Sequence, residues 1–531
     1  MSGNIILSQE KKNDYDEIPY ESNPYAQSHP EHLRTVGFLF GMDPVKMDKA
    51  RILELGCSSG GNIIPMAYYS PNSKIIGIDS SKVQIELANS FVKDLGLKNI
   101  EFKCCSIADL DESLGKFDYI IVHGIFSWVP IEIRKKIFEV CGKLLTEQGI
   151  AYISYNTLPG WNMVKSIRDM MLYHGSFFTN IHEKINQSKV FLNFVSSSLD
   201  GQQSPFALFL KQEMKLLEKQ PDSYLRHDHL EEINQPYYFY EFMTEANGYG
   251  LQYLADSKVS SMFLGNMPPK VIEQLSVIND IVRLEQYMDF IYNRRFRTTL
   301  LCRNNVSLNR SLTADDINKF YLIFKIIPEK PLSTIDLNNN KEDLKFYYNN
   351  TEMSVSTTSP TMKAILYTFA ENVINPLKVE SIIELASKKI KNSAEQIKVD
   401  LLTQGMQFFL KGLIDISLVS NVHIKQIPSK PKVSQLTKYQ VEKTPNLWVT
   451  NNKHERISIN FFDKYALRYM DGSISKDQII LKVIENHVNN GEVTLSKDNK
   501  KIEDKIEIKK ELELFMEQTL ERLLQNCLFV L

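Results

Sequence analysis

The stretch ILELGCSSGGN, residues 52–62, decides the fold class of this chain. An apolar run stops at an acidic residue, and three glycines and two serines follow within a few positions. A glycine-rich loop after a strand brings backbone N–H groups close to an anionic ligand. Such a loop can hold a dinucleotide, a nucleoside triphosphate or a nucleoside sulfonium, and the rest of the sequence has to distinguish them.

Five short apolar runs rich in Ile and Val predict the strands around this loop. Continuous apolar strands that alternate with amphipathic helices are typical of a parallel sheet covered on both faces, so we predict a doubly wound, Rossmann-like α/β core. The helices are expected to begin near Gly61, Ser80 and Pro130, with Ser80 as the N-cap of the second. The predicted strands are ARILELG, KIIGID, IEFKCCS, FDYIIVHG and GIAYISYN, and one face of the second helix carries Val83, Leu87, Phe91 and Leu95.

An arm rich in proline and tyrosine precedes the core. We expect it to be ordered, because Tyr15, Tyr20 and Tyr25 would otherwise expose large apolar surfaces. Ser28 can cap a helix that begins at Pro30.

The length of the chain predicts several domains. After a helical stretch, two segments each offer two helices around a turn and then a third helix that runs into a short strand, an order that suits a winged-helix-like module. The polar stretch SKPKVSQLTKYQVEKTPN is interpreted as the linker between them. The predicted regions are the arm (1–45), the α/β core (46–165), a helical dimerisation or regulatory region (166–300) and two winged-helix-like α+β modules (301–430 and 431–531).

The composition excludes several classes of protein. Acidic and basic residues nearly cancel to a formal net charge of −2, which disfavours a nucleic-acid groove or an anionic membrane as the main partner. Six cysteines form neither a CxxC pair nor a Cys/His cluster at metal spacing, so we predict no metal site and a reducing compartment. No window approaches the roughly 20 apolar residues of a membrane helix, and the first residues do not resemble a signal peptide, so a cytoplasmic protein without membrane insertion is expected.

The loop residues narrow the choice of nucleotide. A triphosphate loop needs a Lys followed by Ser or Thr, whereas Gly60 is followed by Gly61. The dinucleotide fingerprint needs a second glycine where this chain has Ser58. A looser E-x-G-x-x-x-G loop from Glu54 remains, with Asp79 at the end of the next strand. A carboxylate there can bind both ribose hydroxyls in dinucleotide and adenosyl-sulfonium sites alike, so these residues leave both open.

Longer motifs carry a resemblance. The run ILELGCSSGGN…IIGIDSS…FDYIIVHGIFSWVP…LLTEQGIAYISYNTLPGW is similar to a class I S-adenosylmethionine-dependent methyltransferase. With PYESNPYAQSHPEHL before it and YYFYEFMTEANGYGLQYLAD and DFIYNRRFRTTLLCRN after it, most of the chain resembles bacterial methyltransferases that carry a regulatory domain. That family includes the rickettsial protein lysine methyltransferases that modify outer-membrane proteins.

The resemblance implies S-adenosyl-L-methionine as the cofactor and assigns it to particular residues. Asp79, with Ser80 beside it, would bind the ribose hydroxyls, and the adenine would lie near Ser106 and Ile107. Where many relatives have an acid for the adenine amino group, this chain offers either Ser106 or Asp109. The methionine half would be lined by Glu54, Gly56, Cys57, Gly60 and Asn62, and a lid over the cofactor would be formed by Tyr20, Tyr25, Gln27 and His29.

The methyl-acceptor side is expected at the ends of the fourth and fifth strands. His123 and Gly124 would abut the methyl donor. Asn156 would orient an amine, and we expect Tyr155 to face the site because it lies where the fifth strand opens into a loop. An aromatic wall that attracts a lysine ammonium or the sulfonium would be formed by Trp128, Tyr155 and Trp161.

The favoured function is that of a protein lysine N-methyltransferase, which forms a homodimer and acts on lysine-rich surface or outer-membrane proteins. One alternative keeps the chemistry with a small metabolite or a nucleic acid as acceptor, although the chain lacks the Asn/Asp-Pro-Pro-Tyr tetrapeptide of many base-amino methylases. Another alternative is an interaction protein that binds the cofactor as a structural or sensing ligand.

Overall fold

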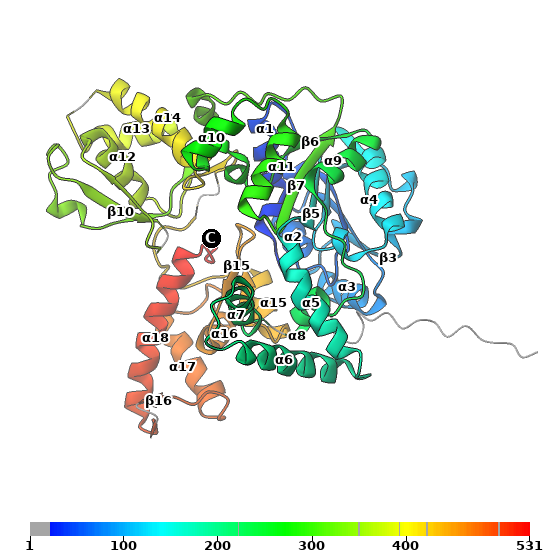
Figure 1. Ribbon diagram of the computed structural model, residues 1–531. Coiled ribbons are helices and arrows are strands. Elements are labelled where there is room, and N and C mark those ends of the chain that lie inside the picture. Colours follow the sequence, from blue (N-terminus) through cyan, green and yellow to red (C-terminus); the bar gives the residue numbers. More distant parts are fainter. Residues whose placement is uncertain are drawn as a thin grey trace, which may run out of the picture.

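The five predicted strands form the parallel part of one seven-stranded sheet (Figure 1). The computed structural model describes residues 22–220, 222–348, 351–391, 393–420, 423–497 and 500–530. The order of the strands in the sheet is β3-β2-β1-β4-β5-β7-β6, which confirms the Rossmann-like α/β core. The parallel strands are β1 (Arg51–Leu55), β2 (Lys74–Asp79), β3 (Ile100–Cys104), β4 (Phe117–Val122) and β5 (Leu145–Asn156).

Helices cover both faces of this sheet, because its apolar strands have to be buried on both sides. One hydrophobic cluster joins one face to three of the helices, and a second cluster joins the other face to the remaining two. On the first face lie α1 (Pro30–Leu39), α2 (Ile63–Tyr69) and α3 (Lys82–Leu95), and on the second lie α4 (Ile131–Leu144) and α9 (Phe239–Gly248).

Helix α3 differs from its prediction in two details. Ser81, not Ser80, is the N-cap, and its Oγ accepts a hydrogen bond from the Gln84 N–H at 3.2 Å. The buried side of the helix carries Gln84, Ile85 and Ala88, whereas Val83 and Leu87 are exposed. The predicted face is turned partly away from the sheet, and its Phe91 packs instead against Tyr439 of the C-terminal part of the chain, with ring centroids 5.3 Å apart.

The region 166–300, expected to be helical, adds two strands to the sheet, β6 (Leu251–Asp256) and β7 (Phe296–Arg303). β7 runs antiparallel between β5 and β6. The stretch QYMDFIYNRRFRTTLL has the apolar spacing of one helix, but α11 (Ile281–Tyr292) ends at Asn293, whose φ of +48° closes the helix. This part of the prediction is wrong because a left-handed C-cap at an asparagine interrupts the period.

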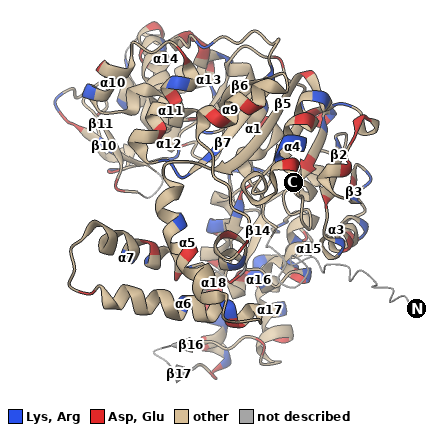
Figure 2. Cartoon of the chain, turned by 45° about the vertical axis from the view of Figure 1, so that its right-hand side comes forward, with Lys and Arg blue, Asp and Glu red and all other residues tan. Residues whose placement is uncertain are grey.

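The rest of this region is helical. Helices α6 and α7 extend away from the sheet (Figure 2). Within the described ranges, no helix combines the length and apolar character needed to cross a membrane. The helices are α5 (Trp161–Gly175), α6 (Ile181–Ser198), α7 (Pro205–Leu217), α8 (Asp222–Tyr224), a π-helical turn (Leu225–His229) and α10 (Pro269–Leu275).

The middle domain contains the predicted order of two helices, a third helix and a short strand, preceded by a strand-rich part. Its strands form two three-stranded sheets, in the orders β11-β10-β9 and β12-β8-β13. The elements are β8 (Tyr321–Ile323), β9 (Ile326–Pro328), β10 (Leu344–Tyr348), β11 (Ser354–Thr357), α12 (Pro360–Ala370), β12 (Leu377–Lys378), α13 (Val379–Ser387), α14 (Ala394–Leu410) and β13 (Asp415–Ser417).

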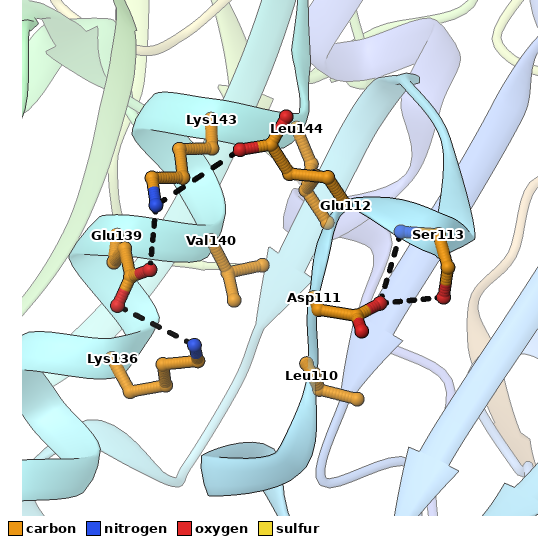
Figure 3. Close-up of a pocket in the computed structure, with 9 residues that line it drawn as sticks. All are labelled: Leu110, Asp111, Glu112, Ser113, Lys136, Glu139, Val140, Lys143 and Leu144. Carbon is orange, nitrogen blue, oxygen red and sulfur yellow. Dashed lines mark hydrogen bonds and ion pairs between the residues drawn. The ribbon is translucent and has the colours of Figure 1, made fainter.

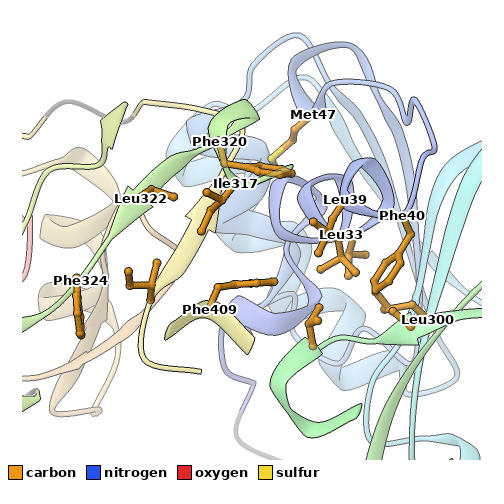
Figure 4. Close-up of a cluster of buried hydrophobic side chains, with 14 of the residues drawn as sticks. Leu33, Leu39, Phe40, Met47, Leu300, Ile317, Phe320, Leu322, Phe324 and Phe409 are labelled. Atoms are coloured by element: carbon orange, nitrogen blue, oxygen red, sulfur yellow. The ribbon is translucent and has the colours of Figure 1, made fainter. Parts of the chain in front are cut away.

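One continuous apolar core holds the middle domain against the first. Leu33 and Leu39 of α1 belong to the same buried cluster as Phe320, Leu322 and Phe409 (Figure 4). Side chains that share one close-packed core cannot move independently, so the middle domain has a fixed place beside α1.

The stretch interpreted as a linker contains helix α15 (Gln435–Lys443), which lies within the predicted bounds of the C-terminal module. Ser434 caps this helix, and Leu436 and Val441 are buried. The polar composition hid a short amphipathic helix. The other elements are β14 (Trp448–Thr450), β15 (Arg456–Ser458), α16 (Phe461–Arg468), α17 (Lys476–Val483), a π-helical turn (Ile484–Val488), β16 (Ser496–Lys497), β17 (Lys500–Lys501) and α18 (Lys505–Gln525).

A buried ion cluster fixes α11 and α9 to β7. Arg297 of β7 is 1 % exposed, and its guanidinium pairs with Glu285 and with Asp289 of α11, each at 2.8 Å. The same group lies 3.9 Å from the ring centroid of Phe239 of α9. The strands that this region adds to the sheet are therefore locked by charge as well as by apolar packing.

Replacing Arg297 by Met should destabilise the fold by about 3–5 kcal/mol, because the buried carboxylate of Glu285 loses its ion pair and that of Asp289 keeps only its pair with Arg294. Thermal unfolding measures the loss as a lower Tm. The matched control is Lys165→Ala, which breaks the exposed Lys165–Asp169 pair on α5 and should cost less than about 1 kcal/mol. Equal Tm values for the two variants would contradict the role of the cluster.

Candidate active site

The glycine loop, residues 56–62, turns at the carboxyl edge of the sheet between β1 and α2. The N–H groups of Gly56 and Cys57 donate to the Ile78 carbonyl of β2 at 2.8 and 3.0 Å. Gly56 has a φ of +73°, and a Cβ there would lie 2.3 Å from the side chain of Ile125, so only glycine fits. The loop lies at the edge where open α/β sheets bind their ligands.

Asp79, at the end of β2, holds the glycine loop in place. Its carboxylate accepts hydrogen bonds from the backbone N–H of Ser58 at 2.8 Å and from that of Ser81 at 2.9 Å. Ser80 lies beside it and is exposed. The Asp79 carboxylate thus has two tasks in this site: it holds the glycine loop, and it is available to a ligand at the end of β2.

Asn62, at the end of the glycine loop, joins three separate parts of the chain. Its Nδ2 donates to Glu54 Oε1 at 2.7 Å and to Ser28 Oγ at 3.1 Å. Its Oδ1 accepts from the Tyr25 N–H at 3.0 Å and contacts His454 Nε2 at 2.8 Å. These bonds use both protons and both lone pairs of the amide. Asn62 thus connects the end of β1, the segment before α1 and the C-terminal domain.

The arm, residues 22–29, crosses the glycine loop. Ser22 Oγ accepts a hydrogen bond from the Gly61 N–H at 2.7 Å, and a Cβ on Gly61 would lie 2.2 Å from the Ser22 carbonyl oxygen. The Tyr25 ring lies against the imidazole of His123, with centroids 3.7 Å apart. Tyr20, the first predicted lid residue, lies outside the described residues. The described part of the arm covers the loop and the end of β4.

The arm leads directly into α1. The helix begins at Pro30 as predicted, but its cap is His29, whose Nδ1 accepts from the Glu31 N–H at 3.3 Å, and not Ser28. Ser28 is buried and bonded to Asn62 instead. The carbonyl of Gln27 accepts from Ser257 Oγ at 2.7 Å, which ties the arm to the chain just after β6.

The end of β4 brings His123 and Gly124 to the same edge. The Gly124 N–H donates to Ser154 Oγ at 2.8 Å, and His123 Nδ1 lies 3.0 Å from the Tyr152 hydroxyl. Burial lowers the pKa of His123 to about 4, so its imidazole is neutral at physiological pH. Burial also raises the pKa of Tyr152 well above its ordinary value, and this hydroxyl therefore stays protonated.

Tyr155 fills the core and does not face the site. Its side chain is 1 % exposed, its ring stacks on Phe242 with centroids 4.1 Å apart, and its hydroxyl lies 3.1 Å from Thr299 Oγ1. Successive strand residues point to opposite faces of a sheet, so Tyr152 and Tyr155 lie on different faces. The prediction for Tyr155 is wrong, and Tyr152 is the tyrosine beside His123.

The other predicted acceptor residues lie nearby but form no complete aromatic wall. Trp128 and Trp161 pack edge to face, with centroids 6.3 Å apart, while Tyr155 packs elsewhere. Asn156 is 4 % exposed, and its N–H donates to Ser127 Oγ at 2.9 Å. Its buried Nδ2 has no hydrogen-bond partner among the described residues, so it is a donor open to a ligand or water.

Ser106 and Ile107 follow β3 at the same edge of the sheet. Ser106 Oγ accepts from the Ala108 N–H at 3.2 Å and so starts a short 3-10 turn, Ile107–Asp109. Asp109 at the end of this turn is exposed. Both Ser106 and Asp109 stay candidates for an adenine contact.

Tyr152 and His454 are site residues that the sequence analysis missed. Tyr152 lies four positions before Asn156 in β5, so the two-residue alternation of the strand offers a signal for it. His454 stands 392 positions away from Asn62, and no local pattern links the two.

A large interdomain cavity of about 1140 Å³ opens beside the arm, between α1, the middle domain and the C-terminal domain. Gln27 and His29 reach it from the arm. Asp415 lines this cavity, and desolvation by the surrounding protein raises the pKa of its carboxyl. The charged lining residues are four lysines, Lys46, Lys258, Lys325 and Lys453, and four acids, Glu31, Asp48, Asp415 and Glu455.

A smaller cavity of about 330 Å³ lies between α4 and the loop before β4 (Figure 3). Its charges are paired with each other, since Lys143 lies 2.9 Å from Glu139 and 4.0 Å from Glu112. Because α4 ends directly before β5 begins, this cavity is at the amino edge of the sheet, away from the glycine loop. We assign it no role in the site.

The sheet, the glycine loop and the following acid define a nucleotide-binding α/β protein, and the comparisons with known proteins identify it as a methyltransferase. Residues 46–219 match the methyltransferase domain family, and residues 221–303 match the predicted methyltransferase regulatory domain. Residues 429–528 match the PKMT C-terminal winged helix domain.

Two relatives match almost the whole chain. The uncharacterized protein RP789 of Rickettsia prowazekii (strain Madrid E) is 56% identical over 520 residues, which cover 98% of this chain and 94% of that protein. The structure of PKMT2 from Rickettsia typhi in complex with AdoHcy is 40% identical, with a TM-score of 0.90, and the match covers 96% of this chain and 100% of that one. The chain therefore belongs to the family of S-adenosylmethionine-dependent methyltransferases that includes PKMT2, and S-adenosylmethionine is its cofactor.

Glu54 provides a physical test of whether the loop fits this cofactor. The carboxyl is 3 % exposed, and burial raises its pKa to about 8 against the opposing hydrogen bond from Asn62. Its Oε2 is buried without a hydrogen-bond partner among the described residues. The methionine half of the cofactor carries an ammonium group, which is the kind of donor that this oxygen lacks. The residues present therefore fit the cofactor.

Cofactor binding should release a proton at pH 7, because Glu54 is protonated in the free protein below about pH 8 and an ammonium partner favours its carboxylate. Affinity for S-adenosylmethionine should rise from pH 6 to pH 8, by at most about 10-fold per pH unit for one linked proton. Calorimetry in two buffers of different ionisation enthalpy measures the proton count.

Glu54→Gln should abolish this proton release, and the surface variant Glu112→Gln should keep it. The folded protein loses stability as the pH rises from the pKa of Glu54 in the unfolded chain to its folded value of about 8, because the buried carboxyl resists losing its proton. Glu54→Gln removes this ionisable group, so it should also raise the Tm at pH 8. Unchanged proton release in Glu54→Gln would show that another group titrates.

Proposed function

We propose that this chain is a protein lysine N-methyltransferase that acts on lysine-rich surface or outer-membrane proteins. The observation that carries the proposal is the contact of Gln27 with both the interdomain cavity and the site. Gln27 lines the cavity, and its side chain influences the pKa of the Tyr152 hydroxyl, which in turn lies 3.0 Å from His123 Nδ1. A side chain that enters from the cavity can therefore approach the end of β4.

The size of the cavity supports a polypeptide acceptor. Pockets for small ligands usually measure about 300–1,000 Å³, whereas this cavity measures about 1140 Å³ and has walls from three parts of the chain. A metabolite would leave most of such a space filled with water, while an extended peptide can bind along it. The likeness to PKMT2 supports the same acceptor class.

The charges around the cavity support protein over nucleic acid. Its lining has equal numbers of lysines and acids, and Lys325 pairs with Glu455 at 3.3 Å. Figure 2 shows Lys and Arg interspersed with Asp and Glu along the helices in this view. A nucleic-acid groove needs an excess of positive charge to neutralise phosphates.

The proposed chemistry uses groups that bind an amine in its neutral form. S-adenosylmethionine supplies a methyl group on a sulfonium centre. The lysine acceptor has to lose its proton before it reacts, and a buried site favours the neutral amine. The neutral imidazole of His123 adds no repelling charge. The ring of Tyr25 beside it attracts an incoming ammonium before deprotonation.

A reducing, cytoplasmic location is part of the proposal. All six cysteines are free thiols, and four of them, at positions 57, 141, 302 and 527, are buried. In an oxidising compartment, free thiols tend to be paired as disulfides.

Incubating the full chain with S-adenosylmethionine and outer-membrane protein fragments should add methyl groups to lysine side chains. Mass spectrometry of the digested fragments maps each added methyl group to a residue. Small primary amines serve as competing acceptors. Cofactor turnover with the amines but without lysine modification would refute the protein acceptor.

Tyr152→Phe in the same assay tests the acceptor side of the site. It should lower kcat about 10-fold through loss of the hydrogen bond to His123, while cofactor affinity stays within about 2-fold. Tyr155→Phe is the matched control on the opposite face of β5, and it should lower stability by about 1 kcal/mol with kcat retained. A loss of kcat in Tyr155→Phe, with kcat retained in Tyr152→Phe, would instead assign Tyr155 to the acceptor side of the site.

We also propose that helices α5, α6 and α7 form the interface of a homodimer. These helices and the turn after α5 leave large apolar side chains uncovered, which include Tyr173 (69 % exposed), Phe177 (67 %), Val190 (60 %) and Phe194 (66 %). Several exposed apolar side chains on one group of helices favour a protein interface, and a second copy is the commonest partner.

Phe194→Glu should convert a dimer to a monomer, because a charge in an apolar interface loses its hydration without gaining a partner. Light scattering coupled to size-exclusion chromatography gives the mass. Val277→Glu, at a site that is 77 % exposed on the loop after α10, is the control and should leave the dimer intact. A monomeric wild-type chain would refute the proposal.

A further inference from the structure

The wing, residues 448–458, is the β14–β15 hairpin of the C-terminal domain. Hydrogen bonds within the hairpin itself hold its turn. His454 occupies the turn with a φ of +61° and is 2 % exposed. The side-chain oxygen of Asn451 accepts the N–H groups of Lys453 and Glu455 at 3.0 and 2.9 Å. The His454 N–H donates to the Asn451 carbonyl at 3.1 Å. These local bonds hold His454 in an uncommon conformation, with its ring presented outward from the hairpin.

The tip of the wing reaches the glycine loop and the arm. His454 Nε2 lies 2.8 Å from Asn62 Oδ1, and its ring lies 5.0 Å from that of His29. Arg456 Nη1 donates to Asn23 Oδ1 at 2.8 Å. The wing therefore contacts the arm at Asn23 and at His29, and it contacts the glycine loop at Asn62.

The direction of the His454–Asn62 hydrogen bond follows from the partners of the amide. Nδ2 of Asn62 donates to the carboxyl of Glu54, so Oδ1 is the acceptor that faces the wing. Nε2 of His454 has to carry the proton and donate it. Burial and the nearby His29 lower the pKa of His454, so its imidazole is neutral. The neutral tautomer with its proton on Nε2 satisfies this contact.

The C-terminal domain is held to the first domain at a second place as well. The Gln435 N–H donates to the Tyr68 hydroxyl at 3.1 Å, and the Tyr69 hydroxyl donates to Ser434 Oγ at 3.2 Å. The Tyr439 hydroxyl donates to Asp94 at 3.1 Å. These contacts of α15 with α2 and α3 keep the domain docked when the wing contact alone is removed.

We infer that His454 is a positioning residue for cofactor binding, through which the wing holds Asn62 and the arm in place over the glycine loop. Cofactor binding and docking of the wing are then linked, and each strengthens the other by the same factor. The inference rests on the cofactor of the proposed function and not on its lysine acceptor, so a failure to methylate lysine leaves it standing.

The test compares three variants of the full chain by calorimetry with S-adenosylmethionine. His454→Leu should weaken binding roughly 10-fold, because Oδ1 of Asn62 loses a donor in a buried site. His454→Gln offers an amide N–H at a similar reach and should bind within about 2-fold of wild type. The control is His487→Leu, which removes a buried histidine of the same domain that bonds Tyr469 and Glu492 instead.

Hydrogen exchange supplies a readout that does not depend on catalysis. In the wild type, S-adenosylmethionine should slow exchange at the amides of residues 451–455 and of the arm. His454→Leu should lose this slowing while α18 keeps its protection. In a double-mutant cycle, adding His454→Leu to Asn62→Ala should weaken binding little further, because Asn62→Ala already removes the acceptor of the His454 contact together with the other bonds of this amide.

Three results would overturn the inference. One is wild-type affinity in His454→Leu with the cofactor still slowing exchange in the wing. Another is an equal loss in His487→Leu, which would assign the effect to general destabilisation of the domain. The third is additive losses in the double mutant, which would separate His454 from Asn62.

Discussion

The amide of Asn62 is the constraint on which the site depends. It is buried, and its four hydrogen bonds run to the end of β1, to two residues of the arm and to the wing of the C-terminal domain. A buried polar group that loses its partner costs about 1–3 kcal/mol. The arm, the loop and the wing therefore have to occupy mutually compatible positions, although they come from distant parts of the chain.

The two halves of the site have different origins. The half assigned to the cofactor stands on the carboxyl edge of the sheet, where Asp79 and Gly56 follow directly from strand ends. The cavity that we propose for the approach of the acceptor is lined by the arm, the middle domain and the wing. His454 at the tip of the β14–β15 hairpin is buried against the first domain, so this hairpin forms part of the contact between the two domains.

Sequence reasoning failed at three places, for two different reasons. Tyr155 was expected at the site because it stands at a strand end, yet the pairing of β5 with β7 sets its ring against Phe242. The helical spacing before Asn293 continues into a strand because a left-handed cap ends the helix there. Helix α15 was hidden in a polar stretch, since Leu436 is buried only by other parts of the fold. Tertiary contacts therefore override a local preference at Tyr155 and at α15, whereas a local backbone conformation ends α11.

By itself, the sequence determined the five parallel strands, the glycine loop and the acid after β2, because buried parallel strands and tight loops constrain residue type over short distances. It also carried the family resemblance, through motifs along the chain. Only the tertiary structure decided that Tyr152 lies beside His123, that β6 and β7 complete the sheet, and that His454 reaches Asn62. These pairings join residues far apart in sequence, and no local periodicity specifies which distant side chain will satisfy a buried polar group.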